Sequence, residues 1–178
     1  LDKETGISIM RIVEELDTGP VCNIYKINIE NNFNAGEVSE KLSSLAAEKI
    51  LDNVDDILDD RANFIEQNNS EATYASKIKK LEGQIDWKDD VKKIIGKING
   101  LYPVPGAFFN FNGERHKILK AEIGNGQGKP GEVLTDYLEI ACGDRKSIKI
   151  LQIQRQGKKI QNISEFVLGT QIKKGSFL

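Results

Sequence analysis

Apolar and polar residues follow a strand-like pattern in two stretches near the start of the chain. Gly6–Val13 is rich in β-branched residues and stops at two glutamates, which is typical of a strand. Val21–Ile29 places apolar side chains at alternate positions, so one face is apolar and the other mostly polar. Asp17–Pro20 lies between the two stretches and contains the glycine and proline of a turn. The pattern predicts two strands joined by a turn.

Helical spacing replaces this alternation from residue 35. Ala35–Leu51 carries apolar residues three and four positions apart, which predicts a helix with one buried stripe. A shorter second helix is predicted after it, with Val54, Ile57 and Leu58 inward and four aspartates outward. We interpret these aspartates as a solvated face and not as a metal site. Residues 67–71 carry no apolar side chain and mark a boundary.

The second half of the chain begins with a helix and continues with strands. Apolar residues recur at helical spacing from Trp87 to Ile98, and Asp86 is placed to cap this helix. Asn112-Gly113 follows alternating aromatic residues and is a strong signal for a β-hairpin. Further strands are predicted at 114–123, 132–135, 138–142 and 147–154, and a short helix near 164–168. Five or six short strands with turns between them suggest a small closed or partly open barrel.

Composition and charge agree with two folded domains. Of the 178 residues, 39% are hydrophobic and 29% charged, as in globular proteins with a core. Residues 1–81 carry 9 Lys and Arg against 16 Asp and Glu, whereas residues 82–178 carry 16 against 11. Such asymmetry suggests two domains with different partners, while two solvated surfaces would give the same numbers. No signal peptide opens the chain, and no apolar run approaches the ~20 residues that cross a bilayer.

The two cysteines, Cys22 and Cys142, lie far apart and lack a CxxC partner. Their number and spacing argue against a disulfide framework or a zinc site and suit a reducing, cytoplasmic compartment. We therefore expect a cytoplasmic protein without bound metal, in which both cysteines are small buried hydrophobic residues.

Asp17 is the residue of the first half with the clearest chemical potential. The predicted turn places its carboxylate at the mouth of a sheet, where it can accept a proton or orient a neighbouring imidazole or water. The alternative is that Asp17 only forms the turn through its own side chain. The residues alone do not decide between these two interpretations.

The segment around Asp17 resembles the signature of the 10-formyltetrahydrofolate-dependent formyltransferases, in which Gly-x-Ser/Thr-Ile/Val leads into Leu/Val-Asp-x-Gly. The positions that fit are Gly6, Ser8, Ile9, Glu14, Leu16, Asp17 and Gly19. Arg11 and Glu15 depart from the residues usual in the family. The resemblance implies that Asp17 is the catalytic aspartate. It also implies that 10-formyltetrahydrofolate is the formyl donor, bound at Val13, Glu14, Glu15 and Leu16.

Over most of its length, the chain also resembles the methionyl-tRNA formyltransferases. Its motifs are Thr73–Ile78 with Glu82 and Ile85–Trp87, then Pro103, Pro105–Ala107, Ile118–Ala121, Pro130-Gly131 and Gly157–Lys159. The implied fold class is α/β plus β. Residues 1–67 would be the C-terminal part of a Rossmann-like catalytic domain, residues 68–81 a linker, and residues 82–178 an OB-like, tRNA-binding barrel. The implied reaction is formyl transfer to the amino group of initiator methionyl-tRNA, by a protein that is monomeric at full length.

The family's Asn-x-His motif and its His-Pro-Ser-Leu-Leu-Pro folate segment lie upstream of this signature and are absent here. The chain begins with Leu1 and is expected to be a C-terminal fragment. His116 lies on a predicted hairpin strand of the second domain, so we interpret it as structural or surface-exposed and not as a replacement for the catalytic histidine. Only Asp17 of the implied Asn, His and Asp triad remains, and we predict that the 178 residues alone do not catalyse formyl transfer.

Contact with tRNA phosphates requires mobile cations along a groove. The candidates are Lys77, Lys79 and Lys80 in the linker, then Arg115, Lys117, Lys120, Lys158 and Lys159. An ordinary basic surface is the alternative for each of them. Two other functions stay open: a sugar-nucleotide formyltransferase, and an OB-type nucleic-acid-binding module without chemistry. The basic second half and Lys77–Lys80 favour a nucleic-acid partner over a nucleotide sugar, and the acidic turn argues against a pure binding module.

Overall fold

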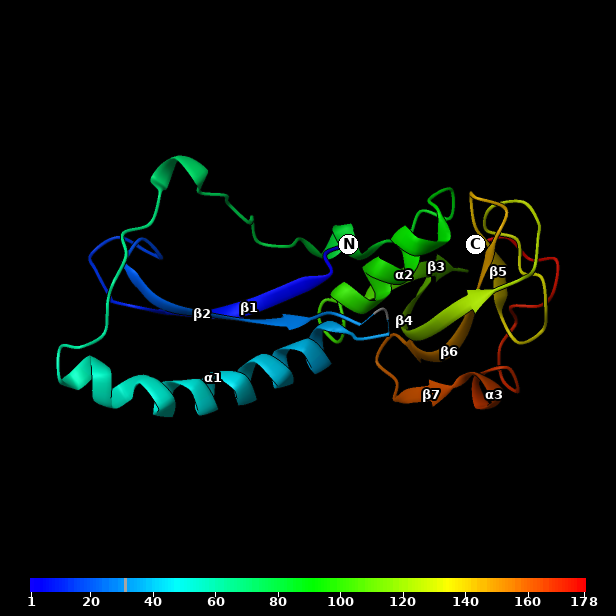
Figure 1. Cartoon of the computed structure of the whole chain (residues 1–178). Helices are drawn as coiled ribbons and strands as arrows, with labels where there is room; N and C mark the ends of the chain where they lie inside the picture. Colours follow the sequence, from blue (N-terminus) through cyan, green and yellow to red (C-terminus); the bar gives the residue numbers. More distant parts are fainter. Residues whose placement is uncertain (31) are drawn as a thin grey trace. The chain divides into compact units, whose positions relative to one another are not determined.

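The computed structural model describes residues 1–30 and 32–178 (Figure 1). These residues form two compact units: Asp2–Lys77, and Ile78–Leu178 together with Leu1. The boundary between Lys77 and Ile78 lies inside the segment 68–81 that was predicted as a linker. No helix among the described residues is both long enough and apolar enough to span a membrane.

The first unit consists of a two-stranded antiparallel sheet and one long helix. Strands β1 (Glu4–Met10) and β2 (Val21–Asn28) pair with Ile7 opposite Tyr25. Helix α1 (Ala35–Leu58) begins at a capping box, in which the Asn34 side chain accepts from the backbone N–H of Glu37. The sequence predicts both strands correctly. The parallel pairing of a Rossmann-like sheet does not occur between the described strands of this unit.

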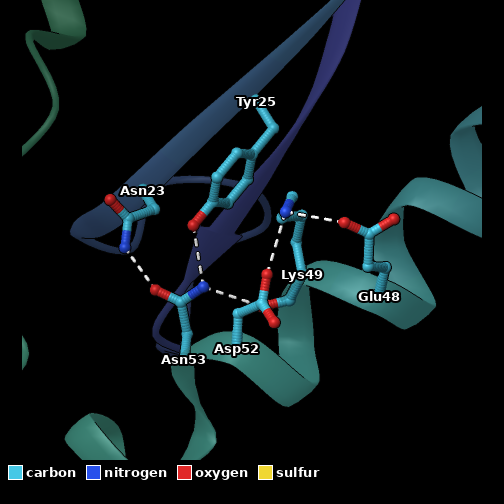
Figure 2. Close-up of polar contacts among 6 residues, drawn as sticks. All are labelled: Asn23, Tyr25, Glu48, Lys49, Asp52 and Asn53. Atoms are coloured by element: carbon cyan, nitrogen blue, oxygen red, sulfur yellow. Dashed lines mark hydrogen bonds and ion pairs between the residues drawn. The ribbon is translucent and has the colours of Figure 1, made fainter.

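The prediction of two helices between residues 35 and 58 is wrong, because α1 is continuous. Neither glycine nor proline interrupts the segment near Asn53, and the Asn53 side chain is buried against β2. Its amide nitrogen donates to the Tyr25 hydroxyl at 2.8 Å and to the Lys49 carbonyl at 2.7 Å (Figure 2). Asn53, at the position where the sequence suggested that one helix ends and the next begins, therefore lies inside α1 and joins this helix to the sheet. The short 3₁₀ helix η1 (Asn69–Glu71) follows.

The second unit begins with the 3₁₀ helix η2 (Lys80–Gly83) and helix α2 (Val91–Gly100). The predicted N-cap, Asp86, is wrong: Asp90 caps α2, whereas Asp86 accepts a hydrogen bond from the Lys88 N–H. The cause is a tertiary contact, because the Asp89 carbonyl accepts from the Gly143 N–H at 2.9 Å. That bond holds the preceding residues outside the helix.

The remaining chain forms a five-stranded antiparallel sheet in the order β3-β4-β6-β5, with β7 also paired to β6. The elements are β3 (Ala107–Phe111), β4 (Glu114–Gly124), β5 (Glu139–Ala141), β6 (Ser147–Arg155), β7 (Ile160–Asn162) and α3 (Ile163–Phe166). The Asn112-Gly113 hairpin is confirmed, and both residues have the positive φ of a tight primed turn. The predicted strand 132–135 makes only isolated bridges, to Phe177 and Ile140, and β7 was not predicted.

The core of the second unit lies between α2 and one face of the sheet. Val91, Ile94 and Ile98 of α2 are buried together with isoleucines from β4 and β6. Both outer strands are covered by backbone from elsewhere in the unit. The Ile85 N–H donates to the Phe108 carbonyl at β3, and the Leu134 N–H donates to the Glu139 carbonyl at β5. Covered edges do not pair readily with other chains.

Candidate functional site

Asp17 lies at the tip of the loop that joins β1 to β2. Its backbone has φ 59°, the left-handed region that few residues other than glycine adopt, and its side chain is exposed. The loop is closed at its base, where the Arg11 N–H donates to the Pro20 carbonyl at 2.9 Å. No hydrogen bond to the Asp17 carboxylate occurs among the described residues. The carboxylate is therefore available to a ligand or to another catalytic group.

Gly19 makes this tight loop possible. A Cβ atom at that position would overlap the carbonyl oxygen of Arg11. Any side chain there would push the two ends of the loop apart and move Asp17. The glycine of the Leu-Asp-x-Gly pattern is thus a geometric requirement of the turn.

The segment after α1 supports the same loop. Ile65 and Val21 exchange two backbone hydrogen bonds of 2.9 Å each. The Arg11 guanidinium lies 4.3 Å from the centre of the Phe64 ring, within the range of a cation–π contact. Gln67 bonds to the loop as well. Sequence analysis missed all three supporting residues, because nothing local in 64–67 shows which loop they contact.

The residues proposed for folate binding, Val13, Glu14, Glu15 and Leu16, lie on the exposed side of the loop. Ile12 and Leu16 are 93% and 92% exposed. Of this stretch only the Glu15 carbonyl accepts an intramolecular hydrogen bond, from the Thr18 hydroxyl. In the described part of the chain, the other backbone groups of residues 12–16 have no hydrogen-bond partner.

Three of the basic candidates share the outer face of the sheet. Lys117 lies opposite Phe108 on β3 and Gln154 on β6, and directly opposed residues point to the same side. Arg115 belongs to this face too, with its guanidinium 5.0 Å from the centre of the Phe108 ring. A bulge at Leu119 shifts the register of β4, so that Lys120 lies opposite Gln152 and joins the same side. Simple alternation from Lys117 would have placed Lys120 on the core side.

Lys158 and Lys159 occupy the exposed turn between β6 and β7, next to this face. The Gln154 side chain donates to the Lys158 carbonyl at 2.9 Å, and the Gln156 N–H donates to the Arg115 carbonyl at 3.0 Å. The exposed linker residues Lys79 and Lys80 come at the start of η2, which ends at Gly83 beside Phe108. Lys77 is also exposed but belongs to the first unit.

His116 is buried, 3% exposed, on the core side of β4. Its ring is stacked on Phe109 with centroids 5.2 Å apart and meets the edge of Phe166. Burial lowers the pKa of His116, partly opposed by the Glu114 carbonyl, which lies 3.1 Å from Nδ1. The structural interpretation of this histidine is confirmed. Burial also raises the pKa of Cys142 to about 12, so this thiol is not an active nucleophile.

No group of three or more His, Cys, Asp or Glu side chains that could hold a metal ion occurs among the described residues. The described residues offer exposed carboxylates on a tight turn, a strip of backbone groups without intramolecular partners, and, in the second unit, a sheet face with basic residues.

Comparison with known proteins shows the family to which the chain belongs. The family described as "Formyl transferase, C-terminal domain" matches residues 77–171. The chain belongs to the formyl transferase family. Methionyl-tRNA formyltransferase of Pelagibacter ubique is 64% identical over 176 residues, and that of Rickettsia prowazekii is 38% identical over 182. The matches cover 99% of this chain but 57% and 58% of those relatives, so the chain spans little more than half of their length.

Two solved structures share the fold. HypX from Aquifex aeolicus, in complex with tetrahydrofolic acid, matches 99% of this chain and 34% of its own at 18% identity, with a TM-score of 0.75. Methionyl-tRNA formyltransferase from Clostridium thermocellum matches 67% of this chain and 51% of its own at 23% identity, with a TM-score of 0.52. At these identities the likeness concerns the fold alone. The expected membership of the formyltransferases, and the resemblance to the methionyl-tRNA subfamily, are confirmed by the family match and the curated relatives.

Proposed function

We propose that the chain is the C-terminal part of an enzyme that transfers a formyl group from 10-formyltetrahydrofolate to the amino group of initiator methionyl-tRNA. The observation that carries the proposal is the 64% identity to the Pelagibacter ubique methionyl-tRNA formyltransferase along nearly the whole chain. In this proposal the first unit completes a Rossmann-like catalytic domain. The second unit is an OB-like barrel that holds the tRNA. Its five-stranded antiparallel sheet and the basic residues on one face of that sheet support this proposal.

When bound, the formyl donor would supply the carbonyl carbon that the methionyl amino group attacks. The bond from that carbon to N10 of the folate would break, and tetrahydrofolate would leave with a proton on N10. The proposed role of Asp17 is to take up a proton from the attacking amine, directly or through a neighbouring imidazole. Exposure of the carboxylate and the absence of intramolecular partners in the described residues support this role. The free backbone groups of residues 12–16 would hold the donor, with Val13 and Leu16 contacting its apolar surface.

Arg115, Lys117 and Lys120 would contact tRNA phosphates, with Lys158 and Lys159 extending the same surface. Gln152 lies opposite Lys120 and Gln154 opposite Lys117, and their amide groups are suited to sugar and phosphate oxygens. The linker cations Lys77, Lys79 and Lys80 are proposed for the same partner, supported by their exposure.

A chimera tests the proposed reaction. Residues 1–178 replace the aligned stretch of the Pelagibacter ubique enzyme, and formation of formyl-methionyl-tRNA is measured with 10-formyltetrahydrofolate as donor. We expect activity in the chimera, loss of activity with Asp17→Asn, and none from the 178 residues alone. A chimera that folds but formylates only an amino sugar nucleotide would replace the proposal with the sugar-nucleotide alternative.

Binding across a salt series tests the basic face. Affinity for tRNA falls as salt rises, and each lost phosphate contact makes the slope of log affinity against log salt less negative by about 1. We expect that change for Lys117→Ala in the chimera. Lys92→Ala is the matched control, because Lys92 is an exposed lysine of α2, which packs on the core side of the sheet. Equal slopes for both variants would remove the sheet face from the tRNA surface.

A further inference from the structure

Gln67 bonds to the Asp17 turn from a point fifty residues further along the chain. Its side-chain nitrogen donates to the Asp17 carbonyl at 3.0 Å and to the Gly19 carbonyl at 2.7 Å. A primary amide has two N–H donors, and both are used here on the two carbonyls of one turn. The orientation of the amide follows from this, because its oxygen could not face two carbonyl oxygens.

We propose that Gln67 is a positioning residue for Asp17 in the formyl-transfer reaction, an inference that rests on the proposed function. The backbone dihedrals of a residue set the direction of its Cα–Cβ bond. Asp17 has φ 59°, a conformation that costs energy outside glycine and persists only where neighbours enforce it. Gln67 holds the carbonyl of Asp17 itself and that of Gly19, and so holds the Cα–Cβ bond from which the carboxylate extends.

Among the described residues, Gln67 is the one side chain from outside the loop that bonds to the carbonyls at its tip. The loop base is fixed by the Arg11–Pro20 and Val21–Ile65 backbone bonds. Within the loop tip, the described contacts are limited to the Thr18 hydroxyl, which donates to the Glu15 carbonyl at 3.3 Å. Without Gln67, the described contacts hold the two ends of the loop and leave the carbonyls of Asp17 and Gly19 to solvent. The carboxylate would then sample several directions.

The chimera described above gives the kinetic test. Misplacement of a catalytic group by about 1 Å costs up to 100-fold in rate, so we expect Gln67→Ala to lower kcat roughly tenfold or more. The KM for methionyl-tRNA should change less than about twofold, because Gln67 contacts only the turn. Glu66→Gln is the control, since Glu66 is the exposed neighbour with no side-chain hydrogen bond among the described residues.

Gln67→Glu adds a readout that a merely structural role would not produce. An ionised carboxylate has no donor and repels both carbonyls, whereas a protonated one donates a single hydrogen bond. The activity of Gln67→Glu relative to the unsubstituted chimera should therefore rise as the pH falls, while the ratio for Gln67→Ala stays constant. A flat ratio for both variants, or a kcat for Gln67→Ala equal to that of the control, overturns the inference while leaving the proposed reaction intact.

Backbone ¹⁵N order parameters, measured by NMR on the 178-residue chain, test the geometry without catalysis. In Gln67→Ala they should fall for residues 16–19 and stay unchanged in the second unit. Unchanged order parameters in that segment overturn the inference even if the chimera is inactive. An inactive unsubstituted chimera contradicts the proposed function alone, so the two failures are distinguishable.

Discussion

Replacing Asn53 with alanine should weaken the first unit selectively. Asn53 is 9% exposed and has three side-chain hydrogen bonds: its nitrogen donates to the Tyr25 hydroxyl and the Lys49 carbonyl, and its oxygen accepts from the Asn23 side chain (Figure 2). These bonds join the middle of β2 to the last turns of α1. Lys49 lies over the Tyr25 ring at 5.6 Å, and the carboxylates of Asp52 and Glu48 raise its pKa.

The magnitude follows from which groups lose their partners. In Asn53→Ala the Lys49 carbonyl keeps its bond within the helix, so two half-buried groups, the Tyr25 hydroxyl and the Asn23 amide, lose a partner. A hydrogen bond of this kind contributes about 1 kcal/mol net, and more where water cannot replace it. We therefore expect a loss of about 2–3 kcal/mol in the free energy of unfolding. Tyr25→Phe should cost about 1 kcal/mol, and the double variant less than the sum.

Two optical signals separate the units in a urea titration. Helix α1 has 24 residues against 10 in α2 and 4 in α3, so circular dichroism at 222 nm reports mainly on the first unit. The single tryptophan, Trp87, lies in the core of the second unit, so its fluorescence reports on that unit. Asn53→Ala should shift the first transition and leave the second unchanged.

Asp55→Asn is the matched control, an exposed position on the same helix without a side-chain hydrogen bond among the described residues. A loss below about 0.5 kcal/mol in Asn53→Ala, within the range of ordinary surface substitutions, would refute the reasoning. Equal shifts of both transitions would also contradict it, because the contacts of Asn53 lie within one unit.

Two further predictions concern the loop and the buried histidine. Gly19→Ala should destabilise the first unit by about 1–3 kcal/mol, because the new Cβ overlaps the Arg11 carbonyl; urea unfolding followed at 222 nm checks this, and an unchanged midpoint would contradict it. Burial lowers the pKa of His116 in the folded state, so the unfolded state binds the extra proton. The stability of the second unit should be full above the ordinary histidine pKa of about 6.5 and fall as the pH drops below it. His116→Phe should reduce this dependence in Trp87 fluorescence measurements, since a phenyl ring keeps the stack on Phe109 without titrating.

Local signals in the sequence predicted local structure well. The Asn112-Gly113 turn, the strands on either side of it and the first two strands follow from alternation and turn chemistry within a few residues. Long-range contacts account for the errors. Asp90 replaces Asp86 as the cap of α2 because a distant glycine binds the Asp89 carbonyl, and Asn53 sits inside a helix because it bonds to β2. Neither partner is near in sequence.

The same distinction applies to the two candidate sites. The position of Asp17 on a tight turn was predictable, because the turn residues themselves create it. The single basic face was not, since Lys120 reaches the side of Lys117 only through the bulge at Leu119. A bulge depends on how two strands pair, and no pattern within one strand encodes it.

The Asp17 loop shows why a short motif is not a complete site. Its left-handed turn exposes the carboxylate and leaves the Asp17 and Gly19 carbonyls unpaired within the loop, so the geometry that gives the motif its chemistry also makes it unstable alone. Residues 64–67 stabilise the loop in three ways. Phe64 makes a cation–π contact with Arg11, Ile65 exchanges two backbone hydrogen bonds with Val21, and the Gln67 amide donates to the Asp17 and Gly19 carbonyls. They come after a 24-residue helix that returns the chain to the loop. The placement of Asp17, and with it the catalytic role proposed for this residue, thus depends on residues 64–67 as well as on the loop itself.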